Sequence, residues 1–185
     1  MNERKIRYGF LAFILDKLGE NRYYGLLVAQ KIVYFLQEVF NVNFPYNPYN
    51  FYFYHFGPYS DALDWDLQMM KSFGLIDIGS DPQRTGYSIE VNKKTAPESI
   101  QLAQKFIDKN RSEIDKVLEL FGNYTPSGLE LASTIHFVYK NNKMNQSKAQ
   151  IRKIVVEKVM GLKPKFSQKD IEVEYDCLVK QNIIA

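Results

Sequence analysis

The sequence predicts a mainly α protein (α+β), built as a helical bundle around a buried central helix with a small antiparallel sheet and winged-helix-like units. Several segments repeat apolar residues near the 3.6-residue period of a helix, whereas only short segments alternate with the two-residue period of a strand. With 45% hydrophobic residues, the 185-residue chain can bury a sizeable core. We therefore expect helices to form that core and strands to be few.

The central helix is expected within the stretch from Tyr23 to Ser60. On a helical wheel its polar side chains, with Lys31 and Tyr34 among them, fall within about a third of the circumference, and the remainder is almost wholly apolar. A polar stripe this narrow predicts that neighbours bury the helix on several sides.

A short strand and a third helix are expected next, after a bend rich in Asn and Pro. Residues 51–56 alternate with a period of two and predict a strand that ends at Gly57 and Pro58. Ser60 is then expected to cap a helix that stops at Gly74.

Residues 75–79 and 87–91 flank a polar tip and predict an antiparallel hairpin. A helix followed by a two-stranded ribbon is the order of a winged-helix unit, in which the hairpin is the wing. The segment 164–184 repeats the Ser cap, the acidic first turn and the helix. It predicts a second winged-helix-like unit that lacks most of its wing.

The remaining helices suggest two domains. Gly122 to Pro126 interrupts the helical pattern and marks the expected boundary. The sequence thus predicts a helical domain with a β-hairpin wing over 1–121 and a basic helical, winged-helix-like unit over 122–185. The other expected helices cover residues 5–18, 95–120, 127–139, 147–160 and 167–181.

Cys177 is the only cysteine, which excludes an internal disulfide framework and suits a reducing compartment. No run of eighteen apolar residues occurs, and the N-terminus has no small-residue cleavage site. We expect a cytoplasmic protein with no membrane partner.

Positive charge gathers in residues 140–169, which hold nine Lys and Arg residues against Glu157 alone. This segment is a candidate for binding phosphates or an acidic protein, and a merely solvated face is the alternative. The residues expected to carry such binding are Lys148, Arg152, Lys153, Lys163 and Lys165.

No catalytic motif is present, and with two histidines in the chain we expect no metal site, cofactor or catalytic residue. Asp66 is the one carboxylate expected on a buried helix face, where it needs a cation or several donors. Lys31 is the first candidate partner and His55 the second. A structural ion pair is favoured over a catalytic one.

Nine aromatic residues lie between positions 44 and 59. They could stack nucleobases, but Lys and Arg are absent from residues 32–70, so walls of the core are favoured.

Two motifs resemble a known family. Residues 29–35, AQKIVYF, resemble the KLQKLLYF-type signature of Panacea antitoxin-like proteins, and residues 56–60, FGPYS, resemble the YGP turn of that family. The segment 162–167, LKPKFS, is similar to one in a prokaryotic branch with a GPYS motif. The resemblance implies a protein-interaction role without a catalytic centre, because members neutralise toxins or act as adaptors. The signature positions, expected to be structural, are Lys31, Tyr34, Gly57, Pro58, Tyr59 and Ser60.

We therefore expect a non-enzymatic, antitoxin-like regulatory protein that binds a protein partner such as a toxin. The alternative is a DNA-binding winged-helix transcriptional regulator, and an enzyme using His55 with Asp66 ranks third. Formation of a homodimer is compatible with each of them.

Overall fold

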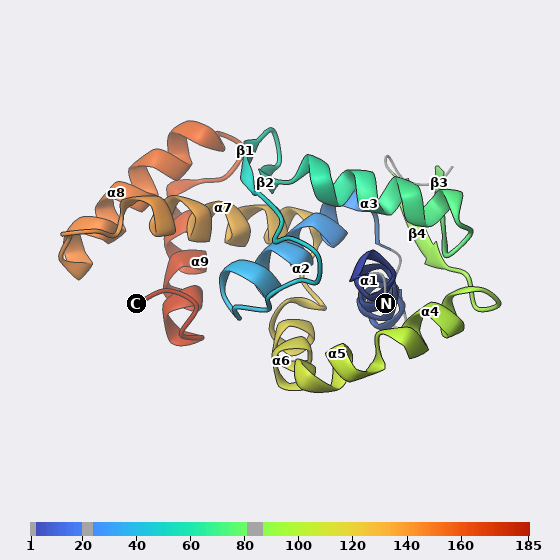
Figure 1. Ribbon diagram of the computed structural model, residues 1–185. Helices are drawn as coiled ribbons and strands as arrows, with labels where there is room; N and C mark the ends of the chain where they lie inside the picture. The colour runs from blue at the N-terminus through green and yellow to red at the C-terminus, as the bar shows by residue number, and fades with distance from the viewer. Residues whose placement is uncertain (1–2, 20–23, 81–86) are drawn as a thin grey trace. The chain divides into compact units, whose positions relative to one another are not determined.

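Helices make up most of the protein in the computed structural model, which describes residues 3–19, 24–80 and 87–185 (Figure 1). Two sheets of two strands each accompany them among these residues. The predicted class, mainly α with a small antiparallel component, is confirmed. The expected helix start at Tyr23 and most of the expected hairpin tip lie outside the described residues. By its contacts the chain divides into a first unit, residues 1–52 and 59–123, and a second unit, residues 53–58 and 124–185.

The elements of each unit follow the chain. The second unit contains α7 (Pro126–Asn142), α8 (Lys148–Leu162) and α9 (Gln168–Lys180). Strands β1 (Tyr52–Tyr54) and β2 (Gly57–Tyr59) pair with each other where the chain passes from one unit to the other. The first unit contains α1 (Glu3–Gly19), α2 (Leu26–Glu38), α3 (Asp61–Ser72), β3 (Ile76–Ser80), β4 (Tyr87–Val91), α4 (Ala96–Leu102), α5 (Gln104–Lys109) and α6 (Arg111–Phe121).

Helix α2, the expected central helix, is buried along most of its length. Every residue from Val28 to Leu36 is buried, and the ring of Phe35 stacks on Phe121 of α6 with centroids 3.9 Å apart. Helix α1 is buried as deeply, because Phe10 and Leu11 are completely inaccessible. Figure 1 shows α1 nearly end-on, with α3 and α4 on opposite sides of it. The core of the first unit is therefore shared by two helices.

Gly9 sets the close crossing of α1 and α4. A Cβ atom built on Gly9 would lie 1.9 Å from the backbone oxygen of Ser99 and 3.0 Å from the Cβ of Ala103. Only glycine allows two backbones to approach this closely. The crossing fixes α4 against α1.

A helix followed by a hairpin occurs in the first unit, as the sequence predicts. Gly74, in the left-handed region with a φ of 67°, ends the turn after α3. The antiparallel strands β3 and β4 then pair with Ile76 opposite Val91. In the second unit α9 is followed instead by the buried Ile183 and Ile184.

The helix expected over residues 95–120 is instead three short helices, α4 to α6. The breaks fall at Ala103 and Asn110, where ψ is −2° and 19°. The side-chain amide of Asn110 donates a 2.8 Å hydrogen bond to the carbonyl of Phe106 and so competes with the helical pattern. Thr95 makes no side-chain cap, because its hydroxyl donates to the carbonyl of Gly74.

The expected strand over residues 51–56 is shorter than predicted and does not end at Gly57 and Pro58. A turn at His55 and Phe56 reverses the chain, and Gly57 begins the partner strand β2. Gly57 has a φ of 88°, and a Cβ there would lie 2.8 Å from the hydroxyl oxygen of Thr134. The left-handed backbone and the close approach to α7 both require glycine.

Helix α7 is the core of the second unit, since it is buried almost continuously from Leu129 to Tyr139 and packs against α8 and α9. Both of these helices begin with a capping box, Ser147 with Gln150 and Ser167 with Asp170. The Ser cap expected in segment 164–184 is confirmed at Ser167, and α8 begins after Ser147, where a helix over 147–160 was expected.

Candidate functional site

The expected buried carboxylate, Asp66, lies inside the first unit and is paired with Arg7. The Nη1 atom of Arg7 lies 2.9 Å from Oδ2 of Asp66, and the two side chains are only 5% and 7% exposed. The hydroxyl of Tyr49 donates a second hydrogen bond, of 2.8 Å, to the same oxygen. The cation is therefore Arg7 of α1 and not Lys31 or His55, which corrects the expected partner.

Arg7 also fixes the bend that precedes β1. Its Nε atom donates a 2.8 Å hydrogen bond to the carbonyl of Pro45, and its Nη2 atom donates to the carbonyl of Asn47. Its guanidinium carbon lies 4.5 Å from the centre of the Tyr49 ring. One arginine thus ties α1, the bend and α3 together, which satisfies the buried charge.

Two tyrosine hydroxyls border this ion pair. Burial, and then the negative charge of Asp66, raises the pKa of Tyr49 well above its ordinary value and also raises that of Tyr8. Both hydroxyls therefore stay protonated at neutral pH and act as donors. The arrangement resembles a structural ion pair more than an acid–base centre.

Ser60 occupies the N-cap position of α3, but its hydroxyl makes no capping bond. Its Oγ atom is buried and has no hydrogen-bond partner. The side-chain amide of Gln30 instead binds the Ser60 backbone, donating to the carbonyl and accepting from the N–H, both at 3.0 Å. Ser60 is therefore the N-cap residue of α3, as expected, but its hydroxyl does not cap the helix.

The other signature positions are mostly buried. Lys31 and Tyr34 are 2% and 1% exposed, and the Tyr34 ring packs edge-on against Phe51 at 5.2 Å. Gly57 and Pro58 are buried, whereas Tyr59 is half-buried and packs against Tyr52 at 6.0 Å. These positions contribute packing to the fold.

The expected core role of the 44–59 aromatics is only partly right. Phe44 and Tyr49 are buried, but Tyr54 and Phe56 are 48% and 58% exposed. These two exposed rings lie at or beside the turn between β1 and β2, where His55 is exposed as well.

Three cations of the basic segment, Arg152, Lys163 and Lys165, pair with carboxylates of α7 or α9. Lys163 is 3% exposed, lies 2.8 Å from Glu130 and donates a 2.5 Å hydrogen bond to the carbonyl of His55. Lys165 lies 2.6 Å from the other oxygen of Glu130. A buried, paired Lys163 cannot bind phosphate, so its expected binding role is corrected.

The other candidate cations lie on α8. Arg152 lies 3.2 Å from Asp176 and 4.0 Å from Glu172, while Lys153 lies 3.8 Å from Glu157. Lys148 is exposed at the start of α8. The positive charge counted along the sequence is therefore reduced by carboxylates that the fold brings beside it.

An exposed apolar row on α3 is a feature that the sequence interpretation missed. Trp65 and Phe73 are 63% and 57% exposed, and Met69 lies between them at the same four-residue spacing. The spacing of Trp65, Met69 and Phe73 was the signal for a second apolar face.

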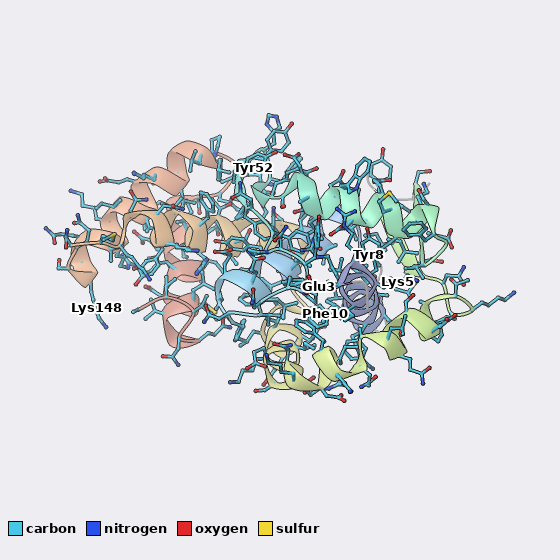
Figure 2. The ribbon with its side chains drawn as sticks, in the orientation of Figure 1. Glu3, Lys5, Tyr8, Phe10, Tyr52 and Lys148 are labelled. Atoms are coloured by element: carbon cyan, nitrogen blue, oxygen red, sulfur yellow. The ribbon has the colours of Figure 1, made fainter. Side chains whose placement is uncertain are left out.

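A cavity of about 480 Å³ lies beside this row and is lined by residues of α1, α3 and α4, Tyr8, Phe73 and Leu102 among them. The Tyr8 and Phe73 rings are 6.0 Å apart. Figure 2 labels Lys5 and Tyr8 on one side of α1 and Glu3 and Phe10 on the other. Lys5 and Tyr8 both line the cavity.

Across the three described ranges, no three His, Cys, Asp or Glu side chains lie close enough to hold a metal ion. No helix in these ranges is long and apolar enough to cross a membrane. In comparisons with known proteins, no family model and no curated sequence matches this chain.

Proposed function

We propose that this protein is a non-enzymatic, antitoxin-like regulator that binds a protein partner through the exposed row on α3. The observation that carries the proposal is the exposure of Trp65 and Phe73 on one helix face. Exposed apolar patches mark interaction sites in folded proteins, and tryptophan is enriched among the residues that dominate binding energy.

The charges beside the row suggest the chemistry of the partner. Asp61 and Asp64 lie in the first turn of α3, one turn or less before Trp65. Burial, and then the charge of Asp61, raises the pKa of Asp64, so an added cation would relieve an unfavourable pair. The partner we propose has an apolar patch bordered by Lys or Arg.

The polar clusters support a binding role over a catalytic one. Asp66 already has Arg7 and Tyr49 as partners, and His55 belongs to the other unit, where its carbonyl accepts from Lys163. A reaction would have to break a buried ion pair before it could use Asp66, at a cost of several kcal/mol.

Co-expression with the protein encoded by the adjacent gene tests the proposal. The wild-type chain should restore the growth of cells that produce the adjacent gene's protein. The double variant Trp65→Ser plus Phe73→Ser should not restore it. Val173→Ser is the matched control, because Val173 is 61% exposed on α9 of the second unit. Equal rescue by all three proteins would contradict the proposal.

A DNA-binding winged-helix regulator is the second candidate, and the order α3, β3, β4 favours it. Lys148 and Arg152 would then carry the contact, and their double substitution by Glu should abolish a salt-dependent shift of duplex DNA. Unchanged mobility of the DNA with the wild-type protein at low salt would reject this candidate.

We place the protein in the cytoplasm, in line with a single cysteine. Cys177 is half-buried, and its sulfur lies 3.8 Å from the hydroxyl of Tyr124. Labelling of intact cells with a thiol reagent that crosses membranes, but not with one that stays outside, is the expected result.

A further inference from the structure

The cavity in the first unit is lined by both cationic and apolar side chains. Arg4 and Lys5 contribute positive charges, and Glu98 is the one carboxylate among the described residues that line it. Met69, Phe73 and Leu102 contribute apolar surface. The cations thus come from α1, whereas these apolar side chains come from α3, its C-cap and α4.

The two cations differ in freedom. The Nη2 atom of Arg4 donates a 3.0 Å hydrogen bond to the Tyr46 hydroxyl, and its guanidinium carbon lies 4.5 Å from the centre of that ring. Lys5 is exposed, and no carboxylate of the described ranges lies within ion-pair distance of it. Lys5 is thus the side chain that can turn to meet an anion.

The walls of the cavity are held in place by contacts already described. Gly9 fixes α4 against α1, and Arg7 with Asp66 fixes α3 against α1. Phe73 and Leu102 are 57% and 40% exposed, so part of the apolar wall still faces water. A ligand that covers these side chains gains hydrophobic free energy without rearranging the helices.

We propose that this cavity binds a small organic anion that has an aromatic or aliphatic body. The body lies against Met69, Phe73 and Leu102, and the anionic group pairs with Lys5. The volume of about 480 Å³ falls within the range of small-molecule sites in proteins. This inference is independent of the proposed protein partner, although Met69 and Phe73 belong to both surfaces.

Two fluorescent probes of nearly the same shape test the site. Anilinonaphthalene sulfonate carries an anionic group, and phenylnaphthylamine has the same aromatic body without the charge. The wild-type protein should bind the sulfonate at one saturable site, at least about tenfold more tightly than the neutral probe, which corresponds to about 1.4 kcal/mol.

Substitutions separate the two parts of the site. Lys5→Glu should weaken the sulfonate about tenfold and leave the neutral probe within about twofold, because it reverses one charge. Leu102→Asp should weaken both probes. Lys105→Glu is the matched control, since Lys105 is exposed on α5 outside the lining, and it should change neither.

Three results would overturn the inference. They are the absence of saturable sulfonate binding to the folded wild-type protein, equal affinities for the two probes, and equal weakening by Lys5→Glu and Lys105→Glu. None of them depends on a protein partner, so failure of this site is distinguishable from failure of the proposed function.

Discussion

The side-chain amide of Gln30 binds both backbone groups of Ser60, and this double hydrogen bond joins residues 29–35 to residues 56–60. Gln30 lies in AQKIVYF and Ser60 ends FGPYS. The contact fixes the start of α3 against α2 without any use of the serine hydroxyl. The role of Ser60 in this fold is therefore that of a backbone anchor.

Substitution at these two positions should separate backbone anchoring from capping. Gln30→Leu leaves the buried N–H of Ser60 without a partner, whereas the Ser60 carbonyl keeps its hydrogen bond from the Asp64 N–H. The substitution should lower the free energy of unfolding by about 1–3 kcal/mol. Ser60→Ala removes a hydroxyl that has no partner and should change it by less than about 0.5 kcal/mol. Urea denaturation measures both. A loss of about 1 kcal/mol or more with Ser60→Ala would restore the capping role.

Breaking the ion pair between Arg7 and Asp66 should be costly. Arg7→Met removes the cation beside the buried Asp66 carboxylate and leaves the hydrogen bond from Tyr49 in place. It should lower the free energy of unfolding by about 3–5 kcal/mol. Lys153→Met, which breaks an exposed pair with Glu157, is the control and should cost no more than about 0.5 kcal/mol. Similar losses in the two variants would argue against a structural role for Asp66.

Two glycines in helices should respond in opposite directions to alanine. Gly9→Ala places a Cβ against the Ser99 backbone and should destabilise the protein by about 1–3 kcal/mol. Gly161→Ala, in α8, meets nothing within 4 Å and should stabilise it by about 0.5–1 kcal/mol. Thermal unfolding followed by circular dichroism gives both signs. A Gly9→Ala protein that is as stable as the wild-type protein would contradict the close crossing of α1 and α4.

Stability should fall steeply at alkaline pH. Burial raises the pKa of Tyr24, Tyr34 and Tyr49 above the ordinary value of 10.0. Because the folded pKa is the higher one, the stabilisation is fully present below about pH 10 and is lost as the pH rises, when unfolded tyrosines ionise and folded ones do not.

Urea denaturation between about pH 9 and 11 measures this loss. Tyr24→Phe should make the free energy of unfolding fall less steeply with pH. The substitution also removes the 2.6 Å hydrogen bond from the Tyr24 hydroxyl to the Leu15 carbonyl. An unchanged free energy of unfolding over this range would show that these hydroxyls ionise equally in both states.

Features that depend on local sequence were predictable in part, although the breaks between α4, α5 and α6 were not. The Ser147 and Ser167 caps and the burial of α2 follow from residue type and period. The partner of Asp66 was not predictable, because Arg7 lies 59 residues away and contact between them depends on how α1 packs. For the same reason the positive charge counted along residues 140–169 overstated the charge available for binding. Glu130 and Asp176 come close to Lys163 and Arg152 only in the folded chain.

The hairpin of β1 and β2 shows a second limit. A period of two indicates a strand, but it does not indicate where a partner strand begins. Gly57 was expected to end the strand over residues 51–56, and it is instead the first residue of β2. The left-handed φ of Gly57 suits either role.

The affinity of the protein for the product of the adjacent gene, measured with wild-type chain and with Trp65→Ser, tests the central claim most directly. Trp65 is exposed on α3, so its substitution should leave the fold intact and remove contact energy only from the complex. We predict a dissociation constant at least about 30-fold higher for Trp65→Ser, which corresponds to about 2 kcal/mol, and an unchanged one for Val173→Ser. A dissociation constant for Trp65→Ser within about twofold of the wild-type value would contradict binding through this face of α3.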